Sequence, residues 1–125
     1  MIAPNLLITD DDSAFRSVLC EALSRRGFQV TQAADGQEAL DLLERTTVHL
    51  ALVDVHMPRV TGLQVIREVT ARPDGPPCVL MSAQLDDQIR REAEQIGAFR
   101  VLSKPFRMPF LSEVVRKALS ETYGW

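Results

Sequence analysis

The stretch VHLALVD, residues 48–54, is apolar throughout except for His49, and it ends on the carboxylate of Asp54. A short, nearly continuous apolar run of this kind is typical of a central strand in a parallel sheet that helices cover on both faces. We therefore expect residues 48–53 to form such a strand, with Asp54 at its carboxyl end.

Four further strands are predicted at residues 5–9, 28–32, 78–81 and 99–102, and amphipathic helical segments separate them. Ser13 is expected to cap the first helix and Gly27 to end it. Five strands alternating with five helices predict one open α/β domain over residues 1–125, with right-handed crossovers. The apolar helix positions are Phe15, Val18, Leu19, Ala22 and Leu23; Ala39, Leu40, Leu42 and Leu43; Leu63, Val65, Ile66 and Val69; Ile89, Ala93 and Ile96; and Phe110, Leu111, Val114, Val115, Ala118 and Leu119, the last group following Pro109.

Composition argues against several classes of protein. The net charge of −3 and the scattered basic residues do not favour direct nucleic-acid binding, which needs clustered Lys and Arg. No run approaches the roughly 18 apolar residues of a membrane span. Cys20 and Cys78 lie far apart among apolar neighbours, which predicts buried free thiols and a reducing, cytoplasmic setting.

Polar residues follow four of the predicted strands. They are Asp10-Asp11-Asp12, Asp54, Ser82 and Lys104. Each alone is an ordinary cap or turn former, but the carboxyl ends of parallel strands open onto one sheet edge, where these residues would converge. Several carboxylates with one hydroxyl and one ammonium predict a phosphoryl-transfer site built around a divalent cation.

The order of these residues resembles the receiver domain of two-component response regulators, of the chemotaxis-regulator type. The resemblance extends from Leu6 to about Leu119 and implies a single flavodoxin-like (βα)5 domain with a parallel sheet of strand order 2-1-3-4-5. It also implies that residues 1–125 hold no output domain. The matching segments are LLITDDDSAFR, ADGQEAL, LALVDVHMPRVTG, VLMSAQ and GAFRVLSKPF.

Carried over residue by residue, the resemblance implies that Asp54 is the phosphoacceptor. Asp10 and Asp11 match the acidic pair that holds Mg²⁺ or Mn²⁺, together with Asp54 and the backbone carbonyl of His56. Asp12 falls where the family varies, and we expect it to cap a helix or lie on the surface.

The resemblance also assigns the residues that respond to the phosphoryl group. Ser82 stands at the position of the switch hydroxyl and Lys104 at the position of the family's lysine, with the bond from Lys104 to Pro105 expected to be cis. His56 and Gln84 occupy two variable positions that tune dephosphorylation in the family.

One position departs from the family pattern. The aromatic residue usual on the fifth strand is replaced by Val101, which cannot swing a ring between two positions because its side chain is stiff at χ1. Phe99, two residues earlier, is expected to face the same side of the strand. Signal output should therefore depend on Ser82, Lys104 and the loop after the fourth strand.

The implied function is Mg²⁺-dependent transfer of a phosphoryl group to Asp54 from a sensor histidine kinase or a phosphotransfer protein. Such a domain is no conventional enzyme, because it catalyses only its own phosphorylation and dephosphorylation. The expected partners are a downstream protein or an attached output domain, and neither a membrane nor nucleic acid. A weak homodimer is expected through the face of the fourth helix, fifth strand and fifth helix.

Two alternatives remain open. A phosphohydrolase of the haloacid-dehalogenase type would use Asp10 as nucleophile, with Asp12 and Ser13 completing its first motif and Ser82 and Lys104 as later motifs. It lacks an acidic pair after Lys104 and has no use for Asp54. An unphosphorylated, receiver-like interaction module is disfavoured because the acidic pair, the acceptor, the hydroxyl and the lysine are all present.

Overall fold

Five parallel strands form a single sheet in the computed structural model, which describes residues 3–125 of the chain. The strands lie in the order β2-β1-β3-β4-β5, so the predicted order is confirmed. Thr9 pairs with Val53 and Asp54 pairs with Met81, so the three central strands end nearly level. The strands are β1 (Asn5–Thr9), β2 (Gln29–Ala33), β3 (Leu50–Asp54), β4 (Cys78–Ser82) and β5 (Arg100–Ser103).

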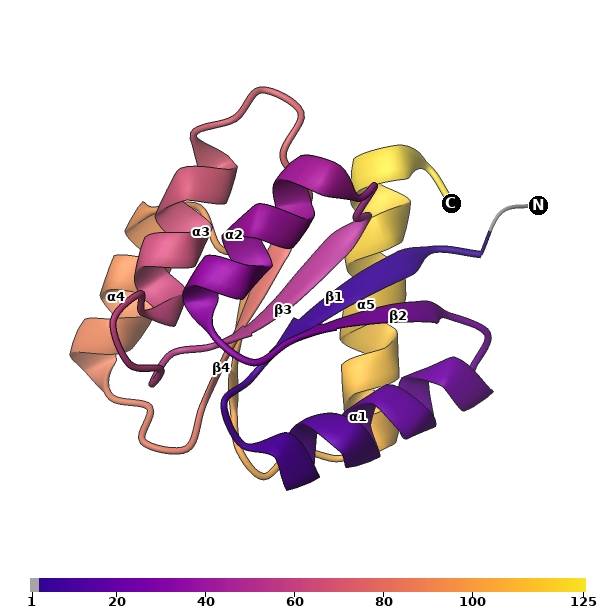
Figure 1. The fold of residues 1–125 in the computed structure, drawn as a ribbon, viewed down its shortest axis with the longest axis horizontal. Helices are drawn as coiled ribbons and strands as arrows, with labels where there is room; N and C mark the ends of the chain where they lie inside the picture. The colour runs from indigo at the N-terminus through magenta and orange to yellow at the C-terminus, as the bar shows by residue number, and fades with distance from the viewer. Residues whose placement is uncertain (1–2) are drawn as a thin grey trace.

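The helices cover both faces of the sheet, as the apolar run of β3 predicted (Figure 1). Helices α1 and α5 pack on one face and α2, α3 and α4 on the other. Alternate residues of a strand point to opposite faces, so Leu6 and Ile8 join the first core and Leu7 the second. The helices are α1 (Ser13–Arg25), α2 (Gly36–Arg45), α3 (Gly62–Thr70), α4 (Asp87–Gln95) and α5 (Met108–Tyr123).

The cap of α1 differs from one sequence prediction and agrees with another. The helix begins at Ser13, and its N-cap is Asp12, whose Oδ1 accepts a hydrogen bond from the Phe15 N–H at 3.1 Å. The prediction that Ser13 caps the helix is therefore wrong, and the capping role expected for Asp12 is confirmed. The N–H that needs an acceptor lies three residues beyond the cap, which places the cap at Asp12.

Two apolar residues assigned to buried helix faces lie at the surface. Val18 is 68% exposed and Phe110 is 45% exposed. In α1 the buried residues include Leu19 and Cys20, and successive residues of a helix are separated by about 100° around its axis. Val18 and Cys20 thus point in nearly opposite directions, and only Cys20 faces the sheet.

Phe99 and Val101 lie on opposite sides of the sheet, which corrects the expectation that they share one side. Phe99 packs against the core beneath α1 and α5, whereas Val101 belongs to the core beneath α2, α3 and α4. The strand begins only at Arg100, so the regular alternation of side chains does not extend back to Phe99.

The prediction of two buried free thiols is confirmed. Cys20 and Cys78 are both free and buried. Burial raises the pKa of the Cys20 thiol to about 11 and that of Cys78 to about 12, so both stay protonated at neutral pH. Within residues 3–125, the helices are all too short or too polar to cross a membrane.

The loop after β3 folds back tightly onto the end of that strand. Gly62 opens α3 just after its N-cap, Thr61, and the Gly62 N–H donates to the carbonyl of Val55 at 3.1 Å. A Cβ atom on Gly62 would collide with the backbone carbonyl of Asp54 and lie 2.9 Å from the Cα of Val55. Glycine is needed here for close approach, and the contact holds the backbone of Asp54 in place.

We predict that Gly62→Ala lowers the free energy of unfolding by about 2–3 kcal/mol, because the colliding atoms belong to the backbone and cannot yield. Urea denaturation would measure the loss. Gly27→Ala is the matched control, since a Cβ there meets no atom within 4 Å and only the positive φ of 93° is strained. That strain should cost about 1 kcal/mol; equal losses in the two variants would contradict the close-approach argument.

Candidate functional site

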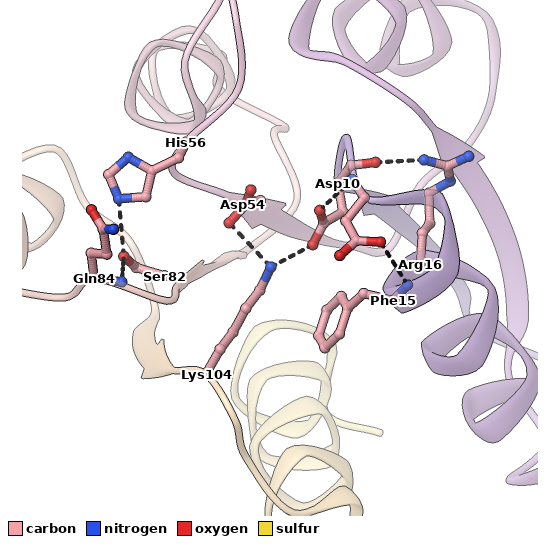
Figure 2. Close-up of polar contacts among 9 residues, drawn as sticks. Asp10, Phe15, Arg16, Asp54, His56, Ser82, Gln84 and Lys104 are labelled. Carbon is pink, nitrogen blue, oxygen red and sulfur yellow. Dashed lines mark hydrogen bonds and ion pairs between the residues drawn. The ribbon is translucent and has the colours of Figure 1, made fainter.

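The carboxyl edge of the sheet brings together residues that lie up to 94 positions apart in the chain. Lys104, from the loop after β5, extends between Asp10 after β1 and Asp54 at the end of β3 (Figure 2). Its Nζ donates to Asp10 Oδ2 at 2.6 Å and lies 3.3 Å from Asp54 Oδ1. Both carboxylate side chains are almost completely buried. The predicted convergence of these three residues is therefore present in the fold.

Asp11 completes a cluster of carboxylates. One oxygen each from Asp10, Asp11 and Asp54 lies within 4.8 Å of the other two. Mg²⁺ binds oxygens at about 2.1 Å in an octahedron, so oxygens on opposite sides of the ion are about 4.2 Å apart. Three carboxylates and one ammonium carry a formal charge of −2, which one divalent cation balances. The donor set matches Mg²⁺ in chemistry and charge, and its oxygens are gathered to nearly the spacing that the ion requires.

The turn that carries the acidic pair is braced by hydrogen bonds. Asp10 Oδ1 accepts from the Asp12 N–H at 2.9 Å, and the Asp10 carbonyl accepts from Arg16 Nη1 at 2.5 Å. Arg16 Nε also donates to Gln32 at 3.1 Å. These bonds leave Asp10 Oδ2 facing Lys104. The role of Arg16 escaped the sequence analysis, although a basic residue in the first turn after three acidic ones was a usable signal.

Asp54 is a buried carboxyl group whose surroundings disfavour its charge. Burial and the neighbouring negative charge of Asp10 raise the pKa of Asp54, and Lys104 opposes them only in part. A cation bound at this site would stabilise the charged form of Asp54, because it replaces the solvation that burial removes.

Lys104 stays charged although it is largely enclosed. Burial acts to lower the pKa of Lys104, but the hydrogen bond to Asp10 and the negative charges of Asp54 and Asp10 outweigh burial and raise it. The ammonium can thus pair with a further anionic group that binds beside Asp54. As the resemblance implied, the peptide bond from Lys104 to Pro105 is cis.

Ser82 lies on the other side of Asp54 and takes part in a separate network (Figure 2). Its buried hydroxyl is 3.3 Å from Nε2 of His56 and accepts a hydrogen bond from the Gln84 N–H at 3.1 Å. The Lys104 N–H donates to the Ser82 carbonyl at 2.8 Å, which ties the β5–α5 loop to the end of β4. The link between the His56 ring and the hydroxyl was not foreseen from sequence.

The comparisons with known proteins decide the family. The family model for the response regulator receiver domain matches residues 6–116. The chain belongs to the response regulator receiver family. Response regulator MprA of Mycolicibacterium vanbaalenii is 36% identical over 94% of this chain and 51% of its own length. The probable chemotaxis protein CheY of Rhizobium etli is 31% identical over 95% of this chain and 92% of its own length.

A solved structure of a response regulator supports the fold. The response regulator TrrA of Thermotoga maritima, described as a complex with Mg²⁺ and BeF, matches with a TM-score of 0.84 at 28% identity, over 93% of this chain and 99% of that chain. Our chain spans about half the length of relatives such as MprA, and most of the length of the Rhizobium etli protein.

Val101 stands where the resemblance led us to expect an aromatic residue, and its side chain is buried. Val101 is 9% exposed and packs in the core beneath α2, α3 and α4. It lies beside Leu80 of β4, two residues before Ser82. A buried β-branched side chain at this point fills space but has no ring to move.

We predict that Asp54→Asn stabilises the metal-free receiver domain, and increasingly so as pH rises. Near pH 3, below the ordinary pKa of 3.8, the Asp54 carboxyl is largely protonated in both folded and unfolded chains, so the two proteins should differ little. As pH rises through the raised folded pKa, only the wild type must bear a buried carboxylate. The difference in free energy of unfolding should approach about 1 kcal/mol near pH 8.

Urea denaturation in the presence of a chelator would measure this difference. Asp74→Asn, at an exposed carboxyl group in the loop before β4, is the control and should show no such trend. An Asp54→Asn variant that is less stable than wild type near pH 8 would contradict the assignment of charge strain to Asp54.

Proposed function

We propose that Asp54 accepts a phosphoryl group from the phosphohistidine of a sensor histidine kinase or phosphotransfer protein, in a Mg²⁺-dependent reaction. The observation that supports this most is the position of the Asp54 carboxylate, buried beside the Lys104 ammonium and within 4.8 Å of two further carboxylates. Asp10 and Asp11 would hold the cation together with Asp54 and the backbone carbonyl of His56. When bound, Mg²⁺ would offset negative charge and orient phosphoryl oxygens.

The chain's own groups account for the transfer step. An oxygen of Asp54 forms the new O–P bond while the P–N bond to the donor histidine breaks, and the electron pair returns to the imidazole nitrogen. Charge builds on the oxygens around phosphorus, and the Lys104 ammonium is close enough to stabilise it. The product is an acyl phosphate, which adds about one negative charge and strong acceptor oxygens at Asp54.

Ser82 is placed to respond to that charge. Its hydroxyl can exchange its contact with His56 for a phosphoryl oxygen, and the loop that begins at Gln84 would move with it because the Gln84 N–H is bonded to the same oxygen. His56 and Gln84 would tune how long the phosphoryl group persists. With Val101 fixed in the core, this loop carries the signal toward α4.

The surface of α4, β5 and α5 is the expected output face. Its exposed charges are candidates for contact with a downstream protein, an attached output domain, or a second copy in a weak homodimer. These charges are Arg90, Arg91, Glu94, Glu113, Arg116 and Lys117.

The acceptor can be tested directly. Asp54→Ala should abolish labelling by phosphoramidate with Mg²⁺, because it removes the proposed acceptor beside the Lys104 ammonium and leaves Asp10 and Asp11 in the role of cation ligands. Intact-mass spectrometry would detect the added phosphoryl group. Undiminished labelling of Asp54→Ala would reject the proposal. A hydrolase of the haloacid-dehalogenase type predicts instead that only Asp10→Ala loses the covalent intermediate, and an unphosphorylated module predicts no labelling of wild type.

The cation site yields a second prediction. Asp11→Ala should weaken Mg²⁺ binding about tenfold or more, and by more than Asp10→Ala, because Asp10 Oδ2 is already engaged by Lys104 at 2.6 Å. Isothermal titration calorimetry would measure the affinities. Asp12→Ala is the matched control, since it removes one negative charge from the same turn but only caps α1. Equal Mg²⁺ affinity in wild type and Asp11→Ala would place the cation elsewhere.

A further inference from the structure

The ring of Phe15 lies against the ammonium of Lys104 (Figure 2). The distance from Nζ to the ring centroid is 4.2 Å, well inside the range of about 6 Å over which an aromatic face attracts a cation. The ammonium therefore has three neighbours: the carboxylates of Asp10 and Asp54, and this ring. The ring is the only uncharged one of the three.

The ring is itself firmly held. Phe15 lies in the first turn of α1, and its N–H donates to Asp12 Oδ1 at 3.1 Å. Its side chain packs against the core beneath α1 and α5. It meets Phe106 edge to face, with centroids 6.0 Å apart and planes at 82°, an arrangement that aromatic pairs favour. The position of the ring is thus set by contacts that do not involve Lys104.

The carboxylate partners of Lys104 must change during the proposed reaction, but the ring need not. A cation held by Asp10, Asp11 and Asp54 competes with Lys104 for Asp10, which accepts its shortest bond. Phosphorylation then alters Asp54. A lysine side chain is long and flexible, and holding it in one place costs conformational entropy. An ammonium that lost both carboxylates could leave the site before a phosphoryl oxygen is there to bind it.

We propose that Phe15 is a positioning residue for Lys104: its ring retains the ammonium at the site while the carboxylates change partners. The attraction acts over the whole ring face and forms no directed bond, so the ammonium can turn from Asp10 toward a phosphoryl oxygen without leaving the ring. The inference rests on the proposed phosphorylation of Asp54. It adds to that proposal a residue that contacts neither Mg²⁺ nor the phosphoryl donor.

Fluorinated phenylalanines at position 15 test this directly. Each added fluorine weakens the attraction of the ring for a cation while nearly preserving its shape. At saturating Mg²⁺, the rate of phosphorylation by phosphoramidate and the affinity for beryllofluoride should fall stepwise with fluorine number. Phe15→Leu, which fills the space without an aromatic face, should mark the lower limit at about three- to tenfold below wild type.

The same fluorinated residues at position 106 provide the matched control. Phe106 touches the Phe15 ring edge to face, and fluorination there nearly preserves the shape of the pair while leaving the electron density of the Phe15 face toward Lys104 unchanged. In that series the phosphorylation rate and the beryllofluoride affinity should not change with fluorine number. The ring current of Phe15 should also shift the Lys104 ε-methylene protons upfield in NMR spectra, both with and without beryllofluoride, and the shift should vanish in Phe15→Leu.

The outcomes separate this inference from the proposed function. A wild type that is not labelled at Asp54 would refute the proposed function. A wild type that is labelled normally, with rates independent of fluorination at position 15, would overturn the role of Phe15 alone. Parallel declines in the two fluorinated series would assign the effect to packing and would likewise overturn it.

Discussion

The Lys104 ammonium lies 2.6 Å from Asp10 and 3.3 Å from Asp54 at the carboxyl edge of the sheet. Without it, two buried carboxylates would repel each other in a region that water solvates poorly, and burial would favour the protonated acids. One positive charge offsets only part of three negative ones, since Asp11 adds the third. The remaining charge disfavours the metal-free domain and favours a divalent cation, and the rest of the site is arranged around this imbalance.

The backbone supplies the rigidity that such a charge arrangement needs. Arg16 Nη1 donates a hydrogen bond to the Asp10 carbonyl at 2.5 Å, and the Lys104 N–H donates one to the Ser82 carbonyl at 2.8 Å. Gly62 lets the loop after β3 press against the backbone of Asp54. These contacts brace the chain where β1 and β3 end and join the end of β4 to the loop after β5, so the side chains start from fixed points and little ordering is left for the moment of reaction.

Two networks flank Asp54, and they have different physical character. On one side the ammonium of Lys104 has ionic partners and the face of Phe15. On the other side the Ser82 hydroxyl is hydrogen-bonded to the imidazole ring of His56 and to the Gln84 N–H. The ionic contacts of Lys104 become stronger or weaker when the charge at Asp54 changes, whereas the hydrogen bonds of a hydroxyl group are readily exchanged for others. The second network therefore suits a switch and the first suits charge stabilisation.

Local sequence was sufficient to predict the five strands, the strand-end position of Asp54 and the buried thiols. The hydrophobic period of a segment and the position at which a strand ends are both determined by a few neighbouring residues. The resemblance added the strand order, which the structure has, and the roles that we propose for Asp10, Asp11, Ser82 and Lys104. Local patterns misplaced Val18, since a valine suits either helix face, and Phe99, since its orientation depends on where β5 begins. The contacts of Phe15 with Lys104 and of His56 with Ser82 were decided only by the tertiary structure. Each contact joins segments that are distant along the chain, and no local sequence pattern specifies which side chains meet once the strands have assembled into the sheet.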